Sequence, residues 1–456
     1  MRRDSRLRTL DCLRMVEGQT NGDLSSLGQE MHAWAVDLFP ICRSLTGDGV
    51  RQTLAYLEAR LPGLQVHSVP SSTAALDWTV PEEWRIRDAW VENSAGERVI
   101  DFRASNLHVV GYSEPVDRWL SRDELDKYLH SLPEQPDAIP YVTSYYRRQW
   151  GFCLTHRARE GLPDGDYRAV IDSELFPGVL NYGELLIPGE SEREIFLSTY
   201  ICHPSMANNE LSGPVVTTAL ARWLLSLPKR RYSYRIVFIP ETIGSLVYLS
   251  RNLPELKRRV LAGFNVTCVG DDRAYGYLPS RHGDTLADRA ALHALRSTVE
   301  PYTEWTWLDR GSDERQYCAP GVDLPVCSIF RSKYGSYPEY HTSLDDLDLV
   351  TPGGLRGGFE ALSRAMLALE MNFVPVAAVL GEPQLGKRGL YANLSQKGSG
   401  ITGKLYLDLL TYSDGHHDLL GIAEILQVPI WDLYAAAVRL EREGLLSTRP
   451  AQGQDA

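Results

Sequence analysis

Four short apolar runs in the middle of the chain each lead into residues that can carry out chemistry. EIFLSTYIC leads into His203, YRIVFIP into Glu241, AGFNVTCVG into Asp271 and Asp272, and PVCSIF, after a Tyr-rich loop, into His341. In a parallel α/β sheet, ligands bind beyond the carboxyl ends of the strands. We therefore expect these side chains to converge on one site.

The residue types indicate metal-assisted hydrolysis. Imidazole and carboxylate groups bind zinc in hydrolases, and a catalytic zinc lowers the pKa of a bound water toward ~7. A separate carboxylate must then move the proton to the leaving amine. His203 and His341 fit as ligands and Glu241 fits as the base, while Glu210 and one of the two strand-end aspartates complete the shell.

The elements that position these residues alternate between strands and helices. Helix-like segments such as GPVVTTALARWLLSL and GSLVYLSRNLPELKRRV separate the apolar runs. This alternation predicts an α/β fold with a mostly parallel sheet and helices on both faces. Two further helices are expected between residues 24 and 60. The segment from 66 to 156 is rich in aromatic and β-branched residues and is typical of a small β-rich module.

Past Pro375 the pattern changes again. Three short helices with a tight second turn, closing in EGLL, are typical of a winged helix-turn-helix. We predict a catalytic domain from residues 24–64 and 160–375, an inserted β-rich domain at 65–159, and a winged helix at 383–449.

Composition and charge limit the function classes. The chain has 456 residues, 43% hydrophobic and 23% charged, which is typical of a globular protein with several domains. Its net charge is −12, and its C-terminal segment carries more acids than bases. Because phosphate binding needs a basic surface, we do not expect this protein to bind nucleic acid.

The seven cysteines are scattered, with no CxxC pair, which favours a reducing compartment. The N-terminal stretch lacks the apolar region of a secretory signal, and no apolar run approaches the ~20 residues that span a bilayer. These features predict a soluble cytoplasmic protein with no membrane partner.

Several motifs together resemble a known family. The strand–His, ANNELSG, PETIGS and YHTSLDD segments are similar to those of zinc aminopeptidases of the clan that includes glutaminyl cyclases and zinc carboxypeptidases. WTVPEEW, DFRASNLHVVGYS and IPYVTSYYRRQWGFC extend the resemblance to three-domain aminopeptidase-like proteins, over about residues 25 to 445. The resemblance implies an aminopeptidase-type catalytic fold, an inserted β-rich domain and a C-terminal winged helix.

The resemblance implies that His203 and His341 are metal ligands and that Glu241 is the general base. The chain departs from the family pattern at three other positions. Asn209 stands at the metal-bridging Asp, Thr242 at the second Glu, and Thr267 at the strand Asp.

Neutral Asn and Thr do not balance two Zn²⁺ ions as carboxylates would. We therefore predict one zinc, held by the two histidines with Glu210 or Asp271. Two ions, or a metal-free site, remain the alternatives.

Other residues are candidates for substrate binding. Arg273 could bind a substrate carboxylate bidentately or pair with the preceding acids, of which Asp272 is also a substrate-binding candidate. Tyr337 and Tyr340 could wall the pocket or pack at a loop edge. Asp313 resembles an Asp that buttresses the site in the same family, and a helix N-cap is its alternative interpretation.

These observations predict a zinc-dependent hydrolase that cleaves an amide bond of a peptide or of a small N-acylated molecule. The resemblance implies a place in sugar or secondary-metabolite pathways. The alternative is a non-catalytic binding or regulatory protein whose winged helix engages DNA or a protein partner. Homo-oligomerisation through the winged helix or the inserted domain is a further expectation.

Overall fold

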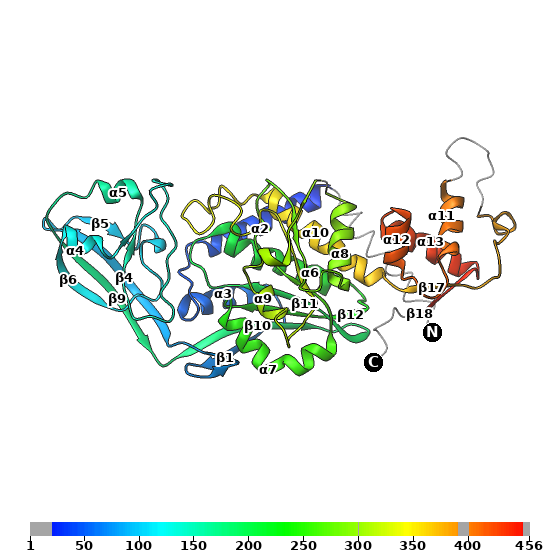
Figure 1. Ribbon diagram of the computed structural model, residues 1–456, viewed down its shortest axis with the longest axis horizontal. Helices are drawn as coiled ribbons and strands as arrows, with labels where there is room; N and C mark the ends of the chain where they lie inside the picture. The colour runs from blue at the N-terminus through cyan, green and yellow to red at the C-terminus, as the bar shows by residue number, and fades with distance from the viewer. Residues whose placement is uncertain (1–20, 300, 391–400, 450–456) are drawn as a thin grey trace.

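The computed structural model describes residues 21–299, 301–390 and 401–449. The N-terminal stretch used for the localisation prediction lies largely outside these residues, as does part of the Gly-rich stretch before the C-terminal helices. Figure 1 shows three parts in a row: a small β-rich part, a central α/β part, and a C-terminal helical part at the opposite end.

The central part is built on one eight-stranded sheet. Its order is β1-β10-β12-β11-β13-β16-β14-β15, and β12, β11, β13 and β16 are mutually parallel neighbours. The bounds are β1 (Gln65–Pro70), β10 (Val179–Ile187), β11 (Ser191–Tyr200), β12 (Tyr232–Ile239), β13 (Val260–Asn265), β14 (Gly276–Leu278), β15 (Thr303–Glu304) and β16 (Val326–Phe330).

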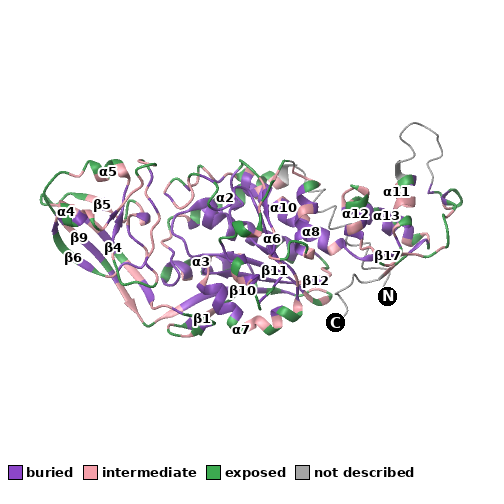
Figure 2. Ribbon diagram, in the orientation of Figure 1, coloured by how far each residue is buried: buried purple, intermediate pink, exposed green. Residues whose placement is uncertain are grey.

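Helices cover both faces of this sheet, as the alternating pattern predicted. Successive residues of β11 point to opposite faces, so Ile195 and Leu197 join one apolar cluster and Phe196 joins another. Figure 2 shows the resulting buried central strands. The first cluster includes residues of α2 (Asn21–Leu38), α3 (Asp48–Glu58), α6 (Ser212–Ser226), α8 (Leu286–Arg296) and α10 (Pro352–Met371), and the second includes residues of α7 (Ile243–Arg259) and α9 (Glu314–Tyr317).

The β-rich part contains a four-stranded antiparallel sheet in the order β5-β4-β9-β6. The small β7–β8 pair accompanies it, whereas the β2–β3 pair packs against α7 of the central part. The bounds are β2 (Ala74–Ala75), β3 (Trp78–Thr79), β4 (Glu83–Asn93), β5 (Arg98–Asp101), β6 (Val116–Ser121), α4 (Arg122–Asp126), β7 (Leu129–His130), β8 (Phe152–Cys153), α5 (His156–Glu160) and β9 (Asp166–Phe176).

Strand pairing differs from the predicted inserted segment, 65–159, at both ends. β1, which falls inside that segment, pairs with β10 in the large sheet. β9, which falls after it, is a central strand of the small sheet and pairs with both β4 and β6. Only two residues separate β9 from β10, so the chain passes almost directly from one sheet to the other. These two residues are Pro177 and Gly178, a short break that lies well after residue 159, where the inserted segment was predicted to end.

The C-terminal part contains the three predicted helices and a two-stranded wing. Its elements are β17 (Val374–Ala377), α11 (Ile401–Thr411), α12 (Leu419–Leu426), α13 (Ile430–Arg442) and β18 (Leu446–Arg449), with β17 and β18 antiparallel. Gln427 ends α12 in the left-handed conformation and forms the tight turn before α13. In the described part of the chain, no single helix is long and apolar enough to cross a membrane, and α12 with α13 meets that test only as a pair bent by 117°.

A polar contact joins this helical part to the central part. Arg289 on α8 donates to both carboxylate oxygens of Asp418, at 2.9 and 2.8 Å. Asn372 donates to the same carboxylate at 2.9 Å, and Asp418 also caps α12 by accepting from the backbone of Gly421. Asp418 therefore both caps α12 and joins the helical part to the central part.

A neutral histidine makes a second contact of this kind. The Nε2 atom of His293, on α8, accepts a hydrogen bond of 2.9 Å from the backbone N–H of Ile430, the first residue of α13. Trp431 packs edge-on against the His293 ring at 5.8 Å. Burial, assisted by Arg296 and Arg289, lowers the pKa of His293 to about 4.

Acidification should therefore loosen the C-terminal helices. A protonated His293 cannot accept the Ile430 hydrogen bond, so its contribution is complete above the unfolded pKa of ~6.5 and is lost as pH falls toward 4. Between pH 7 and pH 5 we expect a loss of about 2 kcal/mol in the stability of this contact. Hydrogen exchange of α12 and α13 at the two pH values measures it. His293→Gln keeps an acceptor without a titrating proton, so an equal pH effect in this variant would contradict the assignment.

Candidate active site

The predicted site residues lie where the parallel strands end. His203 follows β11, Glu241 follows β12, and His341 lies in the loop after β16. The backbone of Thr242 and that of His341 have positive φ angles, 63° and 58°. β-branched and bulky residues seldom adopt this conformation, and such strain gathers at functional sites.

The two ring nitrogens of His203 face different carboxylates. Nδ1 lies 2.7 Å from Oε2 of Glu210, and Nε2 lies 3.6 Å from Oε2 of Glu241. Glu210 belongs to η2 (Ala207–Leu211), a single π-helical turn before α6, and such turns are frequent at functional sites. Glu210 therefore orients the His203 ring and leaves Nε2 toward Glu241, as carboxylates do behind zinc-binding histidines.

A buried arginine supports Glu210 from behind. Arg43, in the loop between α2 and α3, is 1% exposed and donates to the carbonyl of His203 at 2.9 Å. Its Nε lies 3.6 Å from Oε1 of Glu210. Burial raises the pKa of Glu210 to about 8, and the guanidinium of Arg43 opposes that rise. Cys202, His203 and Glu210 have the spacing of a metal site on this side, but the neighbouring cation disfavours an ion there.

His341 is held from two sides by aromatic rings. Tyr340 stacks on it at 3.9 Å between ring centroids, and Tyr141 meets it edge-on at 5.2 Å. The centroid of the His203 ring lies 5.5 Å from that of the His341 ring. Tyr141 comes from the β-rich part, where its backbone N–H donates to the carbonyl of His341 at 2.9 Å. Residues of the inserted segment therefore fix the loop that carries His341.

The two histidines have the donor chemistry of a zinc site. Burial lowers the pKa of both His203 and His341 to about 3, so both rings are neutral and carry a free lone pair. Nε2 of His341 is buried, and no hydrogen-bond partner for it exists among the described residues. Two neutral imidazoles with a carboxylate nearby match the ligand types of catalytic zinc.

Asp313 holds the segment that carries Glu241. Its Oδ1 accepts from the backbone N–H of Thr242 at 2.7 Å and from the hydroxyl of Ser245 at 2.9 Å, at the start of α7. Burial raises the pKa of Asp313 to about 6. Burial, and then the charge of Asp313, raise the pKa of Glu241. The side chain of Asp313 does not cap α9, so the geometry favours its buttressing interpretation.

The sequence predicts Asp271 as a metal ligand, but in the structure it does not line the cavity with the two histidines. It is fully buried and accepts from the backbone and the hydroxyl of Ser332 at 2.8 and 2.9 Å. Asn208 and the backbone of Arg273 donate to it as well. Both carboxylate oxygens of Asp271 are therefore engaged in hydrogen bonds that join loops.

The four predicted substrate-binding residues also lie apart from the cavity. Arg273 is paired with Glu339 through two hydrogen bonds of 2.8 Å. Asp272 accepts from a threonine hydroxyl at the surface, and the hydroxyl of Tyr337 donates to the buried Asp345 at 2.9 Å. Tyr340 acts through its stacking on His341 rather than by facing the cavity.

Two of the three positions where the family has carboxylates, Asn209 and Thr267, are joined by neutral hydrogen bonds. The hydroxyl of Tyr200 donates to Oδ1 of Asn209 at 2.9 Å and also contacts the hydroxyl of Thr267. Thr267 donates in turn to the backbone carbonyl of Asn209 at 3.0 Å. A second cation would find no carboxylate among these three side chains, which argues for one ion rather than two.

Glu241 and the two histidines line a cavity of about 300 Å³. The central part contributes Leu45, Cys202, Thr242, Ile243 and Arg315, and the inserted segment contributes Trp78, Tyr141, Thr143, Tyr145 and Tyr146. The inserted segment therefore closes one side of the site. The sequence interpretation missed these aromatic residues, although the IPYVTSYY stretch that contains the three tyrosines carried part of the family resemblance.

The fold and the site define an aminopeptidase-like protein. A zinc aminopeptidase from Bacillus subtilis superimposes with a TM-score of 0.55 at 11% identity, over 74% of this chain and 93% of that one. A peptidase M28 precursor from Shewanella amazonensis gives a TM-score of 0.54 at 12% identity, over 79% and 97%. At such identities the likeness concerns the fold.

Closer relatives place the chain within a family. Residues 32–372 match the model described as domain of unknown function DUF4910, and residues 374–448 match a winged helix-turn-helix. The chain belongs to the DUF4910 family. A Clostridium acetobutylicum protein, named provisionally for polysaccharide biosynthesis and an aminopeptidase-like domain, is 44% identical over 88% of this chain and 92% of its own length. A crystal structure from that organism, assigned provisionally to the peptidases, has 42% identity and a TM-score of 0.89 over 94% and 98%.

Proposed function

We propose that this protein is a zinc-dependent hydrolase that cleaves an amide bond of a peptide or a small N-acylated molecule. The observation that carries the proposal is that His203 lies close to both His341 and Glu241 and that all three line one cavity. His203 and His341 would hold one ion through neutral ring nitrogens. Zinc, when bound there, supplies a Lewis acid that polarises the amide carbonyl and lowers the pKa of the attacking water.

Residues of this chain then transfer the proton. Glu241 accepts the proton of the attacking water at its carboxylate and delivers it to the nitrogen that leaves. Its raised pKa suits this exchange, because a base must both take up and release the proton near neutral pH. Asp313 fixes the start of α7 and thereby the direction of Glu241, while Glu210 and Arg43 fix the His203 ring.

Metal analysis tests the proposal directly. We expect about one zinc per chain in protein purified without added metal or chelator. His203→Ala and His341→Ala should each lose it, whereas the exposed His282→Ala should keep it. About two ions per chain would mean that the neutral Asn209–Thr267 region does accept a cation. No zinc, even after zinc is offered, would overturn the catalytic proposal.

The neutral side chains of Asn209, Thr242 and Thr267 favour one rival, a non-catalytic binding or regulatory protein. Under that function the cavity would hold a ligand and the winged helix would engage DNA or a protein partner. The backbone of the first residue of α13 is hydrogen-bonded to His293, and this opposes insertion of that end of the helix into a groove. A gel shift that depends on residues 383–449, together with an absence of bound metal, would support the rival.

We further propose that the protein works in the cytoplasm. Among the described residues six cysteines are free thiols, five of them buried. This pattern suits a reducing compartment.

A further inference from the structure

The charges that line the cavity are unusual for an enzyme that binds a free amine. Among the described residues that line the cavity, Glu241 is the only carboxylate and Arg315 is the only arginine or lysine. Asp313 and Glu314 lie close by but do not line it: Asp313 holds the start of α7, and Glu314 accepts from Tyr334 and from Asn265. A substrate ammonium would therefore have to pair with the same carboxylate that must move the proton.

Arg315 is free to bind an anion. It is exposed, and its Nη2 donates a single hydrogen bond of 2.7 Å to the hydroxyl of Thr242, next to Glu241. Within the described part of the chain it forms no ion pair. A guanidinium carries five N–H donors in a planar fork that matches a carboxylate, so most of its donors remain available. By contrast, Arg273 is fully engaged with Glu339.

The remaining wall suits an apolar or aromatic group. Trp78 and Tyr146 meet edge-to-face at 5.4 Å and are 41% and 53% exposed, although both line the cavity. Leu45 and Ile243 add aliphatic surface from the central part. Exposed aromatic faces at the mouth of a cavity gain contact area when a ring or a branched side chain covers them.

We propose that the substrate class is an N-acylated amino acid with a free carboxylate, rather than a peptide with a free N-terminus. This inference rests on the proposed function. The carboxylate binds Arg315, the apolar side chain packs against Trp78 and Tyr146, and the acyl carbonyl faces the two histidines. Water adds across the amide: a C–O bond forms, the C–N bond breaks, and Glu241 transfers the proton to the leaving nitrogen, giving a carboxylic acid and a free amino acid.

Three matched compounds test the substrate class. N-acetyl-L-phenylalanine has a carboxylate and no amine, N-acetyl-L-phenylalaninamide has neither charge, and L-phenylalaninamide has only the amine. We expect the zinc-loaded full-length protein to deacetylate the first with the highest kcat/KM. Arg315→Gln should raise the KM for that compound by about 10–100-fold, as expected for loss of a charged hydrogen bond, and raise the KM for the neutral compound by much less. Arg310→Gln, in the same segment but outside the cavity lining, should change neither.

Calorimetric binding to the Glu241→Gln protein separates this inference from the proposed function. Binding of N-acetyl-L-phenylalanine that Arg315→Gln weakens, without turnover by the native enzyme, would support the anion pocket and count against hydrolysis. Faster turnover or tighter binding of L-phenylalaninamide would overturn the inference and leave the hydrolase proposal standing. Failure of all three compounds to bind would also overturn the inference. So would binding of N-acetyl-L-phenylalanine that Arg315→Gln does not weaken.

Discussion

Glu241→Gln should lower kcat/KM by about 10²–10⁴-fold on any amide that the native protein cleaves, because the amide side chain cannot accept the proton of the attacking water. The change is nearly isosteric, and the segment remains held by the bonds from Thr242 and Ser245 to Asp313. The zinc content should stay equal to that of the native protein. Initial rates and elemental analysis on the same preparation check both statements.

Glu210→Gln is the matched control, because it alters the other carboxylate that contacts His203. Its carboxylate orients the ring, so we expect zinc affinity to fall by about 10–100-fold and activity to recover when zinc is added in excess. Glu241→Gln should not recover. If Glu241→Gln kept native activity, or if excess zinc restored it, Glu241 would not be the general base.

Much of the central fold could be predicted because its strands are buried on both faces. Continuous apolar runs such as residues 236–239 are the direct result of that burial, and a His or Glu that comes directly after such a run is expected at the carboxyl end of its strand. His203 and Glu241 were found in this way, and His341 from the Tyr-rich loop that follows β16. The ends of the inserted segment were harder to predict from the sequence, because only two residues separate β9 from β10.

Side-chain direction explains the errors in the candidate site. Asp271 does follow β13, but the Ser332 backbone and hydroxyl offer it hydrogen bonds that turn it into the protein. Position along the chain does not reveal such partners, which lie about 60 residues away. Arg43, Tyr141 and Arg315 reach the site from loops and from a short helix, where no periodic pattern marks the inward-facing residue.

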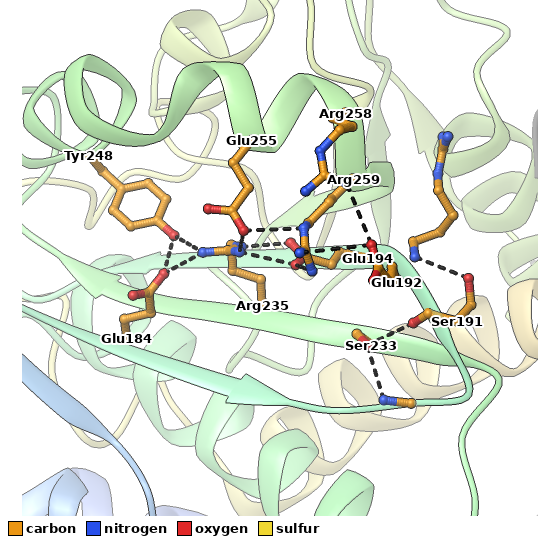
Figure 3. Close-up of polar contacts among 12 residues, drawn as sticks. Glu184, Ser191, Glu192, Glu194, Ser233, Arg235, Tyr248, Glu255, Arg258 and Arg259 are labelled. Carbon is orange, nitrogen blue, oxygen red and sulfur yellow. Dashed lines mark hydrogen bonds and ion pairs between the residues drawn. The ribbon is translucent and has the colours of Figure 1, made fainter. Parts of the chain in front are cut away.

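A buried charged cluster in the central sheet carries the largest expected effect on stability (Figure 3). Arg235 on β12 is 3% exposed and forms hydrogen bonds of 2.6 and 3.0 Å with both oxygens of Glu194 on β11. It also donates to Glu184 on β10 at 2.7 Å and to the hydroxyl of Tyr248 on α7 at 3.0 Å. One guanidinium therefore ties three adjacent strands to the helix above them.

Arg235→Met should destabilise the central part by about 3–5 kcal/mol, because it leaves the buried Glu194 and the partly buried Glu184 without their main cation. In a domain of this size that corresponds to a drop in melting temperature on the order of 10 °C. Arg258→Met, on the exposed end of α7, removes an arginine of the same size and should change stability by less than about 0.5 kcal/mol.

Adding Glu194→Gln to Arg235→Met should recover part of the loss, since a neutral amide needs no buried counter-charge. Thermal unfolding followed by circular dichroism, with zinc removed from every sample, compares the four proteins without a contribution from metal binding. Equal melting temperatures for Arg235→Met and Arg258→Met would show that the cluster contributes little. A double variant less stable than Arg235→Met would show instead that Glu194 is held by Arg259, whose Nη1 lies 3.5 Å from it.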